Sequence, residues 1–322
     1  MIARLLLALA GILLVFAPPA GADTWPAKPV TLIVPFPPGG GTDTFARPLA
    51  AQLSKQLGKN VIVDNRAGAC GTIGASAAAK AAPDGYTFFI GAAHHAIAPS
   101  IYAKLDYKIE VDFIPITLIA HPPQVVVVNP NRIAAADLAA LIDMAKKNPG
   151  KLSYASAGNG TTHHLAGELF KQLTQTDIVH VPYKGAGPAL QDMLGAQVDM
   201  MFDGLGSSAS HLRSGKLKAL AVAAPKRAQA FPNVPTAAEA GLRGYEVSTW
   251  YAIWAVKGTP KEIVDRMYQE VTKALQTPEL REIWINNGTD VPAMTPAEFG
   301  AYLKQEIARW GAVVKAGNIK VD

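Results

Sequence analysis

The chain has 322 residues, of which 49% are hydrophobic and 17% are charged, and its formal net charge is +5. This composition fits a globular protein of one large or two ordinary domains and excludes an intrinsically disordered chain. The lysines and arginines are scattered and form no basic stripe with aromatics, so we do not expect nucleic-acid binding. The mild positive charge is still compatible with small anionic ligands.

The first residues have the pattern of an export signal. A short basic start, Met1–Arg4, precedes an apolar run, Leu5–Phe16, and the small residues Ala20–Ala22 form a cleavage site. The apolar run is shorter than the roughly 20 residues that span a bilayer. We therefore expect a cleaved signal peptide over residues 1–22 rather than a retained membrane anchor, with the mature chain starting near Asp23.

Apolar runs of strand length alternate with helical segments along the chain, which predicts an α/β fold with largely parallel sheets. The expected strands are Val30–Val34, Val61–Val63, Thr87–Ile90, Val125–Val128, Leu152–Ala155, Ile178–Val181, Val198–Phe202 and Leu217–Val222. Cys70 is the only cysteine. No disulfide within the chain is possible, so the apolar core alone must stabilise the fold.

An amphipathic helix is expected between the first two strands. Its buried stripe repeats every four residues, at Phe45, Leu49, Leu53 and Leu57. Thr42 or Asp43 can cap the start of this helix, and Gly58 ends it.

A second helix of this kind is expected from Thr161. Its apolar face consists of Leu165, Ala166, Leu169, Phe170 and Leu173, and the loop 156–160 precedes it. Both helices thus begin at a glycine-containing loop directly after a strand. The N–H groups and the positive macrodipole end at such a helix start can bind an anion.

The carboxy-terminal part is mainly helical. Helical patterns at 260–275, 278–286 and 296–314 each open with a proline in the first turn, and a strand-like run at 248–256 precedes them. An alanine-rich stretch at 75–82 is expected to form a short helix.

The glycine run at residues 39–41 resembles a nucleotide-binding loop but fails its requirements. Gly39 and Gly41 fit a G-x-G-x-x-G pattern, but Thr44 stands in the third glycine position. Asp43 would place a carboxylate where the pyrophosphate should lie, and the lysine of a phosphate loop is missing. We therefore expect no nucleotide cofactor, and an anion such as a small carboxylate at this helix start instead.

Several long motifs resemble one family, the Bug-type periplasmic receptors of tripartite tricarboxylate transporters. They are WPAKPVTLIVPFPPGGGTDTFAR (25–47), VDNRAGACGTIGASAAAKAAPDGYT (63–87), YASAGNGTTHHLAGELF (154–170), HVPYKGAGPALQDMLGAQVDMMFD (180–203) and GKLKALAVAAPKRAQAFPNVPTAAEAGL (215–242). Together they cover nearly the whole mature chain and occur in the family's order.

The resemblance implies a two-domain, type II periplasmic binding protein of the Venus-flytrap kind, with a cleft between two lobes. Residues 23–123 plus 245–322 would form lobe one, and 124–244 would form lobe two. Such a receptor binds a small carboxylate without turnover, is not an enzyme and needs no cofactor. Its partners would be membrane transporter subunits or a sensor, and we expect a periplasmic monomer.

The resemblance also implies the ligand-binding residues, with 38–43 lining the first-lobe side of the cleft and 156–162 the second. The expected ligand-binding residues are Pro38, Gly40, Gly41, Thr42, Asp43, His94, His95, Ser156, Gly158, Asn159, Thr161, Thr162, His163, Tyr183, Lys184, Gly185 and Asp203. The ranges 38–43 and 156–162 coincide with the two helix starts that periodicity indicates.

Several of these residues have an alternative structural role. Thr42 and Asp43 can be helix caps, and Asp43 would repel a carboxylate unless an amine or a water intervened, so amides near Gly40 and Gly41 are favoured. Lys184 could neutralise a carboxylate or simply be solvated. Asp203 could bind a water or a donor on the ligand, or cap the segment that follows it.

Two histidine pairs, His94-His95 and His163-His164, lie at expected pocket positions. Adjacent side chains diverge, so neither pair alone can form a metal site, and we expect none. The family more often carries a small hydroxyl residue at His94, an asparagine at Ala98 and a polar residue such as glutamine at His163, so these departures would tune which acid is bound. A neutral imidazole would donate a hydrogen bond, and a protonated one would pair with a second carboxylate. Burial in the core or solvation of these histidines stays open.

Two other functions remain as alternatives. A secreted hydrolase would pair Ser156 with His163 or His164, but no G-x-S-x-G elbow and no orienting acid are evident. A metal-binding receptor would use the histidine pairs across the cleft. Two facing anion-binding helix starts favour a dicarboxylate ligand, aliphatic or aromatic.

Overall fold

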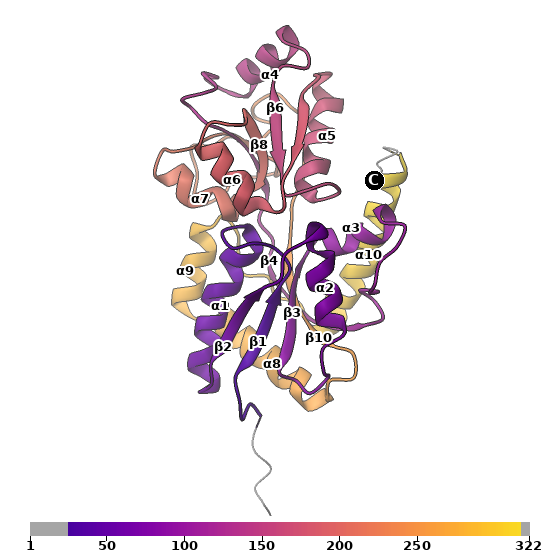
Figure 1. Cartoon of the computed structure of the whole chain (residues 1–322). Coiled ribbons are helices and arrows are strands. Elements are labelled where there is room, and N and C mark those ends of the chain that lie inside the picture. The colour runs from indigo at the N-terminus through magenta and orange to yellow at the C-terminus, as the bar shows by residue number, and fades with distance from the viewer. Residues whose placement is uncertain (1–24, 317–322) are drawn as a thin grey trace, which may run out of the picture.

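The structure is a computed structural model that describes residues 25–316, so the expected signal peptide lies outside the described residues. The protein consists of two lobes, each built on one five-stranded sheet with helices on both faces (Figure 1). Between residues 25 and 316, no helix is both long and apolar enough to cross a membrane.

The first lobe contains the sheet of order β2-β1-β3-β10-β4. Its strands are β1 (Val30–Val34), β2 (Val61–Asn65), β3 (Thr87–Ala92), β4 (Phe113–Ala120) and β10 (Tyr251–Val256). Its helices are α1 (Gly41–Leu57), α2 (Thr72–Ala79), α3 (His94–Ile101), α8 (Lys261–Leu275), α9 (Pro278–Asn286) and α10 (Pro296–Ala316), with a 3₁₀ turn at Ala69–Gly71. Apolar clusters cover both faces of the sheet.

The second lobe contains the sheet of order β7-β6-β8-β5-β9. Its strands are β5 (Gln124–Val128), β6 (Ser153–Ser156), β7 (Val179–Pro182), β8 (Met200–Gly204) and β9 (Lys218–Val222). Its helices are α4 (Leu138–Lys147), α5 (Thr162–Thr174), α6 (Ala186–Leu194) and α7 (Leu205–Arg213). Here too, apolar side chains are buried on both faces.

Each sheet has one reversed strand, and in each case the chain enters this strand from the other lobe. β10 runs antiparallel to both β3 and β4, and β5 runs antiparallel to both β8 and β9, while the remaining pairs are parallel. The predicted α/β class with largely parallel sheets is therefore confirmed. The sequence patterns did not predict β4, α3, α4 or α7.

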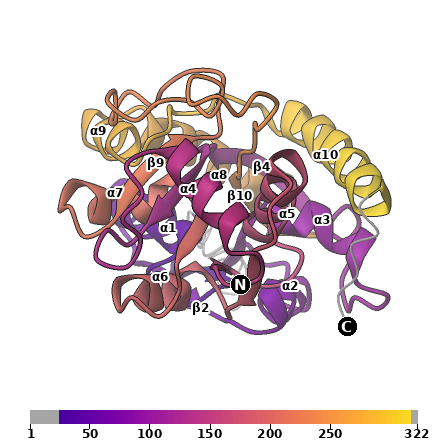
Figure 2. The ribbon, with the colours of Figure 1, turned by 90° about the horizontal axis from the view of Figure 1, so that it is seen from above.

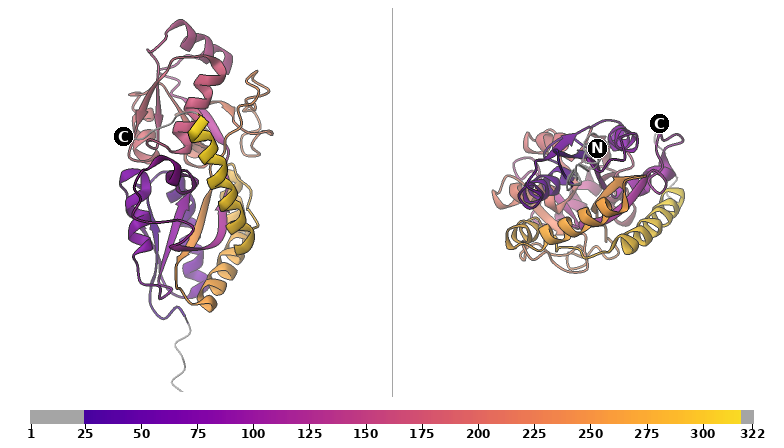
Figure 3. Two further views of the ribbon diagram at one scale, coloured as in Figure 1. Left: turned by 90° about the vertical axis from the view of Figure 1, so that its right-hand side faces the viewer. Right: turned by 90° about the horizontal axis from the view of Figure 1, so that it is seen from below.

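The two segments that cross between the lobes lie side by side. The Gln124 N–H donates to the Val247 carbonyl at 2.9 Å, and the Thr249 N–H donates to the Pro122 carbonyl at 3.1 Å. This short antiparallel pair forms a double connection between the sheets. On this side of the molecule α10 extends from the first lobe toward α5 of the second (Figures 2 and 3), and Leu165 belongs to the same buried cluster as Trp310.

Candidate ligand-binding site

A small cavity of about 40 Å³ lies between the lobes, where the loops after the strands of both sheets meet. From the first lobe and the crossing segment, it is lined by Phe36, Gly40, Gly41, Thr42, Ala92, His94, Thr249 and Tyr251. From the second lobe, it is lined by Ala157, Thr161, Thr162, His163 and Ala186. Both lobes therefore contribute to one site.

The first residues of four helices reach this cavity. They are Gly41 and Thr42 of α1, His94 of α3, Thr162 and His163 of α5, and Ala186 of α6. The first N–H groups of a helix have no partner within their own helix, and the helix dipole makes this end positive. Among the described residues that line the cavity, none is Lys, Arg, Asp or Glu. The site therefore attracts an anion through backbone groups and not through charged side chains.

The loop before α1 is braced by Asp43. The Asp43 Oδ2 accepts hydrogen bonds from the Gly39 N–H at 3.1 Å and from the Arg47 Nε at 2.8 Å, and its Oδ1 accepts from the Asn65 Nδ2 at 3.0 Å. Gly40 is the N-cap and no side chain caps the helix, so the expected cap at Thr42 or Asp43 is wrong. Asp43 is buried just outside the cavity lining, and its carboxylate already has three donors.

Tyr251 of β10 fills the space beside the start of α1. A Cβ added at Gly41 would overlap the Tyr251 hydroxyl, and a Cβ added at Gly204 of the second lobe would lie 3.4 Å from the same oxygen. Tyr251 therefore lies where the two lobes meet, and only glycine fits at position 41. Burial raises the pKa of Tyr251, so its hydroxyl stays protonated.

The loop before α5 is held by its own side chains. The Ser156 Oγ lies 2.6 Å from the His180 Nε2 and accepts from the Gly158 N–H at 3.1 Å. The Thr161 Oγ1 donates to the Gly158 carbonyl at 2.7 Å. Ser156 is fully buried and its histidine partner is His180. The pairing with His163 or His164 in the hydrolase hypothesis is therefore wrong.

His94 extends across the cleft. Its Nδ1 lies 3.3 Å from the Gly160 carbonyl oxygen of the second lobe, and its Nε2 has no partner among the described residues. Burial lowers the pKa of His94 to about 4. His95, by contrast, points into the first lobe, where its ring packs on Phe89 with 4.9 Å between the centroids, and it does not line the cavity.

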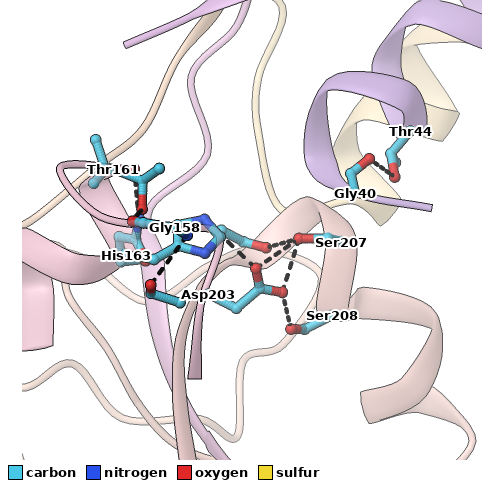
Figure 4. Close-up of polar contacts among 12 residues, drawn as sticks. Gly40, Thr44, Gly158, Thr161, His163, Asp203, Ser207 and Ser208 are labelled. Atoms are coloured by element: carbon cyan, nitrogen blue, oxygen red, sulfur yellow. Dashed lines mark hydrogen bonds and ion pairs between the residues drawn. The ribbon is translucent and has the colours of Figure 1, made fainter. Parts of the chain in front are cut away.

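His163, which lines the cavity, faces Asp203 at the end of β8 (Figure 4). The His163 Nε2 lies 3.7 Å from the Asp203 Oδ1, and the His163 Nδ1 has no partner among the described residues. The hydroxyl groups of Ser207 and Ser208 donate to the Asp203 carboxylate. Burial lowers the pKa of His163 to about 4 and raises the pKa of Asp203 to about 6.

The other expected site residues surround the cavity without lining it. Lys184 is exposed, and the Tyr183 hydroxyl donates to the Asp192 carboxylate at 2.7 Å. The two lobes pack closely next to the cavity. A Cβ added at Gly185 would lie 2.7 Å from Pro37, and a Cβ added at Gly187 would overlap the Pro38 carbonyl. The lobes thus touch directly around the cavity. Pro38, Asp43, His95, Ser156, Gly158, Asn159, Tyr183, Lys184, Gly185 and Asp203 all lie outside the lining, as does Ala98.

The sequence analysis did not indicate four lining residues, namely Phe36, Ala92, Thr249 and Tyr251, whereas Ala157 falls within the expected range 156–162 and Ala186 follows the expected Gly185. Ala92 is the last residue of β3, so the usual position of ligands beyond the carboxyl ends of strands could have indicated it. No local pattern marks Thr249 or Tyr251. Within residues 25–316, no three His, Cys, Asp or Glu side chains gather in a way that could hold a metal ion.

Comparison with known proteins gives a consistent result. The family described as "Tripartite tricarboxylate transporter family receptor" matches residues 45–319. A structure of the periplasmic binding protein BugD is 36% identical, with a TM-score of 0.88 over 92% of this chain and 100% of that chain. Rpa4515 of R. palustris, solved with adipate, is 37% identical with a TM-score of 0.88 at the same coverage. MatC from Rhodopseudomonas palustris, with bound malate, is 36% identical with a TM-score of 0.84 over 90% of this chain and 100% of that chain.

Proposed function

The chain belongs to the family of tripartite tricarboxylate transporter receptors, and we propose that this solute-binding receptor captures a small carboxylate in the cleft and delivers it to a membrane transporter. One observation carries the choice of ligand. Four helix starts from two lobes line a cavity whose described lining contains no Lys or Arg. Backbone N–H groups at helix starts bind carboxylates as well as phosphates. The adipate and malate in the two R. palustris relatives support this ligand class.

Binding is proposed to close the two lobes. Residues 23–123 plus 245–322 would move as one lobe and 124–244 as the other, about the paired crossing segments 122–124 and 247–249. A ligand that contacts both helix starts binds the closed form better than the open form, and this difference in affinity shifts the population toward closure. The contacts of Pro37 and Pro38 with Gly185 and Gly187 would form in the closed form.

The proposed contacts fall into two groups. The amides near Gly40, Gly41 and Thr42 would bind one end of the carboxylate ligand, and Thr161 and Thr162 would bind it from the second lobe. Asp43, Ser156 and Gly158 would act indirectly, because they set the shape of the two loops.

The proposed location is the periplasm, after cleavage near Ala22. A chain expressed with its first 22 residues in a Gram-negative host should be recovered from the periplasmic fraction with a mass that begins near Asp23. The proposed monomeric state predicts a single species near the mass of one mature chain in light scattering.

The central test is a calorimetric and thermal-shift screen of mono-, di- and tricarboxylates at neutral pH. Each acid is paired with its uncharged amide, for example succinate with succinamide, as a matched control. A ligand at 100 times its Kd should stabilise the protein by about 2.7 kcal/mol. The proposal fails if no carboxylate stabilises the protein, or if the amides stabilise it as much as the acids.

A further inference from the structure

The contact between His94 and Gly160 determines which nitrogen of this imidazole carries hydrogen. The Nδ1 lies 3.3 Å from the Gly160 carbonyl oxygen, and a carbonyl oxygen can only accept a hydrogen bond. The Nδ1 therefore carries the N–H. His94 is 2% exposed, and burial lowers its pKa to about 4, so the ring is neutral at pH 7. A neutral imidazole has one N–H only, which leaves the Nε2 as a bare acceptor.

His163 on the second lobe likewise has one donor nitrogen and one acceptor nitrogen. Its Nε2 faces the Asp203 carboxylate at 3.7 Å, and an N–H on this nitrogen is favoured because the carboxylate is negative. The unpartnered Nδ1 is then the acceptor. Two neutral imidazoles that line one cavity therefore each keep an unpaired acceptor nitrogen.

A plain carboxylate cannot satisfy these nitrogens. Its oxygens accept hydrogen bonds from the helix starts, but an ionised carboxylate has no hydrogen to donate. An ammonium group could donate, but the described lining has no Asp or Glu, and the two buried carboxylates next to it, Asp43 and Asp203, already accept hydrogen bonds from other residues. The charge of an ammonium group would therefore lack a free partner in this desolvated site. A neutral hydroxyl group meets both conditions, because it donates one hydrogen bond and carries no charge.

We infer that the ligand of this cleft is a hydroxycarboxylate, whose carboxylate lies on the helix starts of α1 and α5 and whose hydroxyl group donates to the Nε2 of His94. The inference rests on the proposed function and makes its substrate class more specific. A site built to pair with a substrate hydroxyl discriminates strongly against the analogue that lacks it, because the buried polar group then stays unpaired.

The test compares matched acids on the unmodified mature protein by calorimetry at pH 7.5. The pairs are malate and succinate, lactate and propanoate, and mandelate and phenylacetate, with aspartate as the ammonium analogue of malate. In each pair that binds, the hydroxy acid should bind about tenfold tighter or more, and aspartate should bind more weakly than malate. If the plain acids bind as tightly as the hydroxy acids, or if aspartate binds as tightly as malate, the inference is wrong while the proposed function stands. If no carboxylate of the wider screen binds, the proposed function itself fails.

Substitutions of His94 test whether its Nε2 accepts the hydrogen bond from the ligand hydroxyl group. His94→Phe keeps a flat ring but removes both nitrogens, so the preference for the hydroxy acid should fall to about twofold or less. His94→Asn, which keeps an N–H and an acceptor oxygen, should retain part of the preference and provides a second variant if His94→Phe does not fold. His211→Phe, a partly exposed position on α7 outside the cavity, is the control. An unchanged preference in folded His94→Phe would overturn the assignment.

Discussion

The thiol of Cys70 on the first lobe packs against Gly158 on the second lobe, so closely that a Cβ added at Gly158 would lie 2.5 Å from the Cys70 Sγ. Gly158 has a φ of +128°, a backbone conformation that favours glycine. Because Gly158 lies in the loop before α5, this contact links the first lobe to one of the two ligand loops. Cys70 is the only cysteine of the chain, so thiol labelling of the protein reports on this position alone.

Ligand should protect Cys70 from thiol reagents. Opening of the cleft separates Cys70 from Gly158, and a ligand that favours closure should slow maleimide labelling by about fivefold or more. The measurement is the labelling rate by mass spectrometry, with and without a bound carboxylate. Cys70→Ser/Ser214→Cys, which moves the thiol to an exposed position, is the control and should label at one rate. Equal rates for Cys70 with and without ligand would contradict closure at this contact.

Gly41→Ala should weaken both folding and ligand binding. The new Cβ would overlap the Tyr251 hydroxyl, and overpacking of this kind costs about 1–3 kcal/mol. The free energy of unfolding and the ligand Kd measure the two effects. Tyr251→Phe in the same chain should restore part of the stability, because it removes the overlapping oxygen. Gly195→Ala is the control, since Gly195 has a φ of −76° and its nearest neighbours to an added Cβ lie at 3.4 Å or more.

Asp43→Asn should lower the affinity for all carboxylates by a similar factor. The carboxylate acts on the ligand through the loop, since it accepts from Gly39, Arg47 and Asn65. Loss of such charge-assisted hydrogen bonds costs about 1–3 kcal/mol of stability. Asp64→Asn is the matched control, because Asp64 pairs with Arg66 at the surface, where an ion pair contributes about 0–1 kcal/mol. A tighter affinity in Asp43→Asn would instead indicate direct repulsion between Asp43 and the ligand.

The parts of the site that neighbouring residues form could be predicted from the sequence. The parts that depend on residues far apart in the sequence could not. The helix starts at Gly41 and Thr162 follow from apolar periodicity and from the loops before them, which are features of adjacent residues. Tyr251 lies 210 positions after Gly41 and reaches it only because β10 inserts into the first sheet as the reversed strand. No pattern within the segment 248–256 contains that information.

The role of His94 depends on residues that lie far from it in the sequence. The segment His94–Ile101 is only eight residues long and contains Pro99 in its interior, so the sequence pattern does not predict its helix. Only the resemblance to the family indicates that His94 lies in the pocket. The hydrogen-bond polarity of its ring depends on Gly160, which lies on the other lobe. Neither the nitrogen that donates nor the one left without a partner can be read from residue types alone.

The stability of the unliganded protein should fall as the pH drops from about 6.5 to 4. Burial lowers the pKa of His94 and His163 to about 4 and that of His95 to about 3, whereas an unfolded histidine has a pKa of about 6.5. In this window the unfolded chain binds protons that the folded chain does not, so the free energy of unfolding decreases by up to about 1.4 kcal/mol per pH unit for each imidazole. Asp203 acts in the opposite direction, because its raised pKa of about 6 lets the folded chain hold a proton that the unfolded chain releases.

Denaturant unfolding at pH 7.5, 6.0 and 5.0 measures this slope. Burial also lowers the pKa of His180 to about 4, so four histidines outweigh one aspartate and the free energy of unfolding should still increase with pH. In His95→Phe the slope should be shallower by up to about 1.4 kcal/mol per pH unit. A stability that does not change with pH, or that rises on acidification, would show that these imidazoles are not buried in the neutral form.

Ser156→Ala separates a receptor from a hydrolase. The Ser156 Oγ is fully buried, lies 2.6 Å from the His180 Nε2 and accepts from the Gly158 N–H, so it shapes the loop before α5. Its removal leaves a buried N–H without an acceptor, which costs about 1–3 kcal/mol, and ligand affinity should fall with stability. Ser210→Ala, at an exposed position of α7, is the control and should change neither. The unmodified protein should turn over no ester substrate, and an esterase activity abolished by Ser156→Ala would refute the receptor function because the serine would then act as a nucleophile.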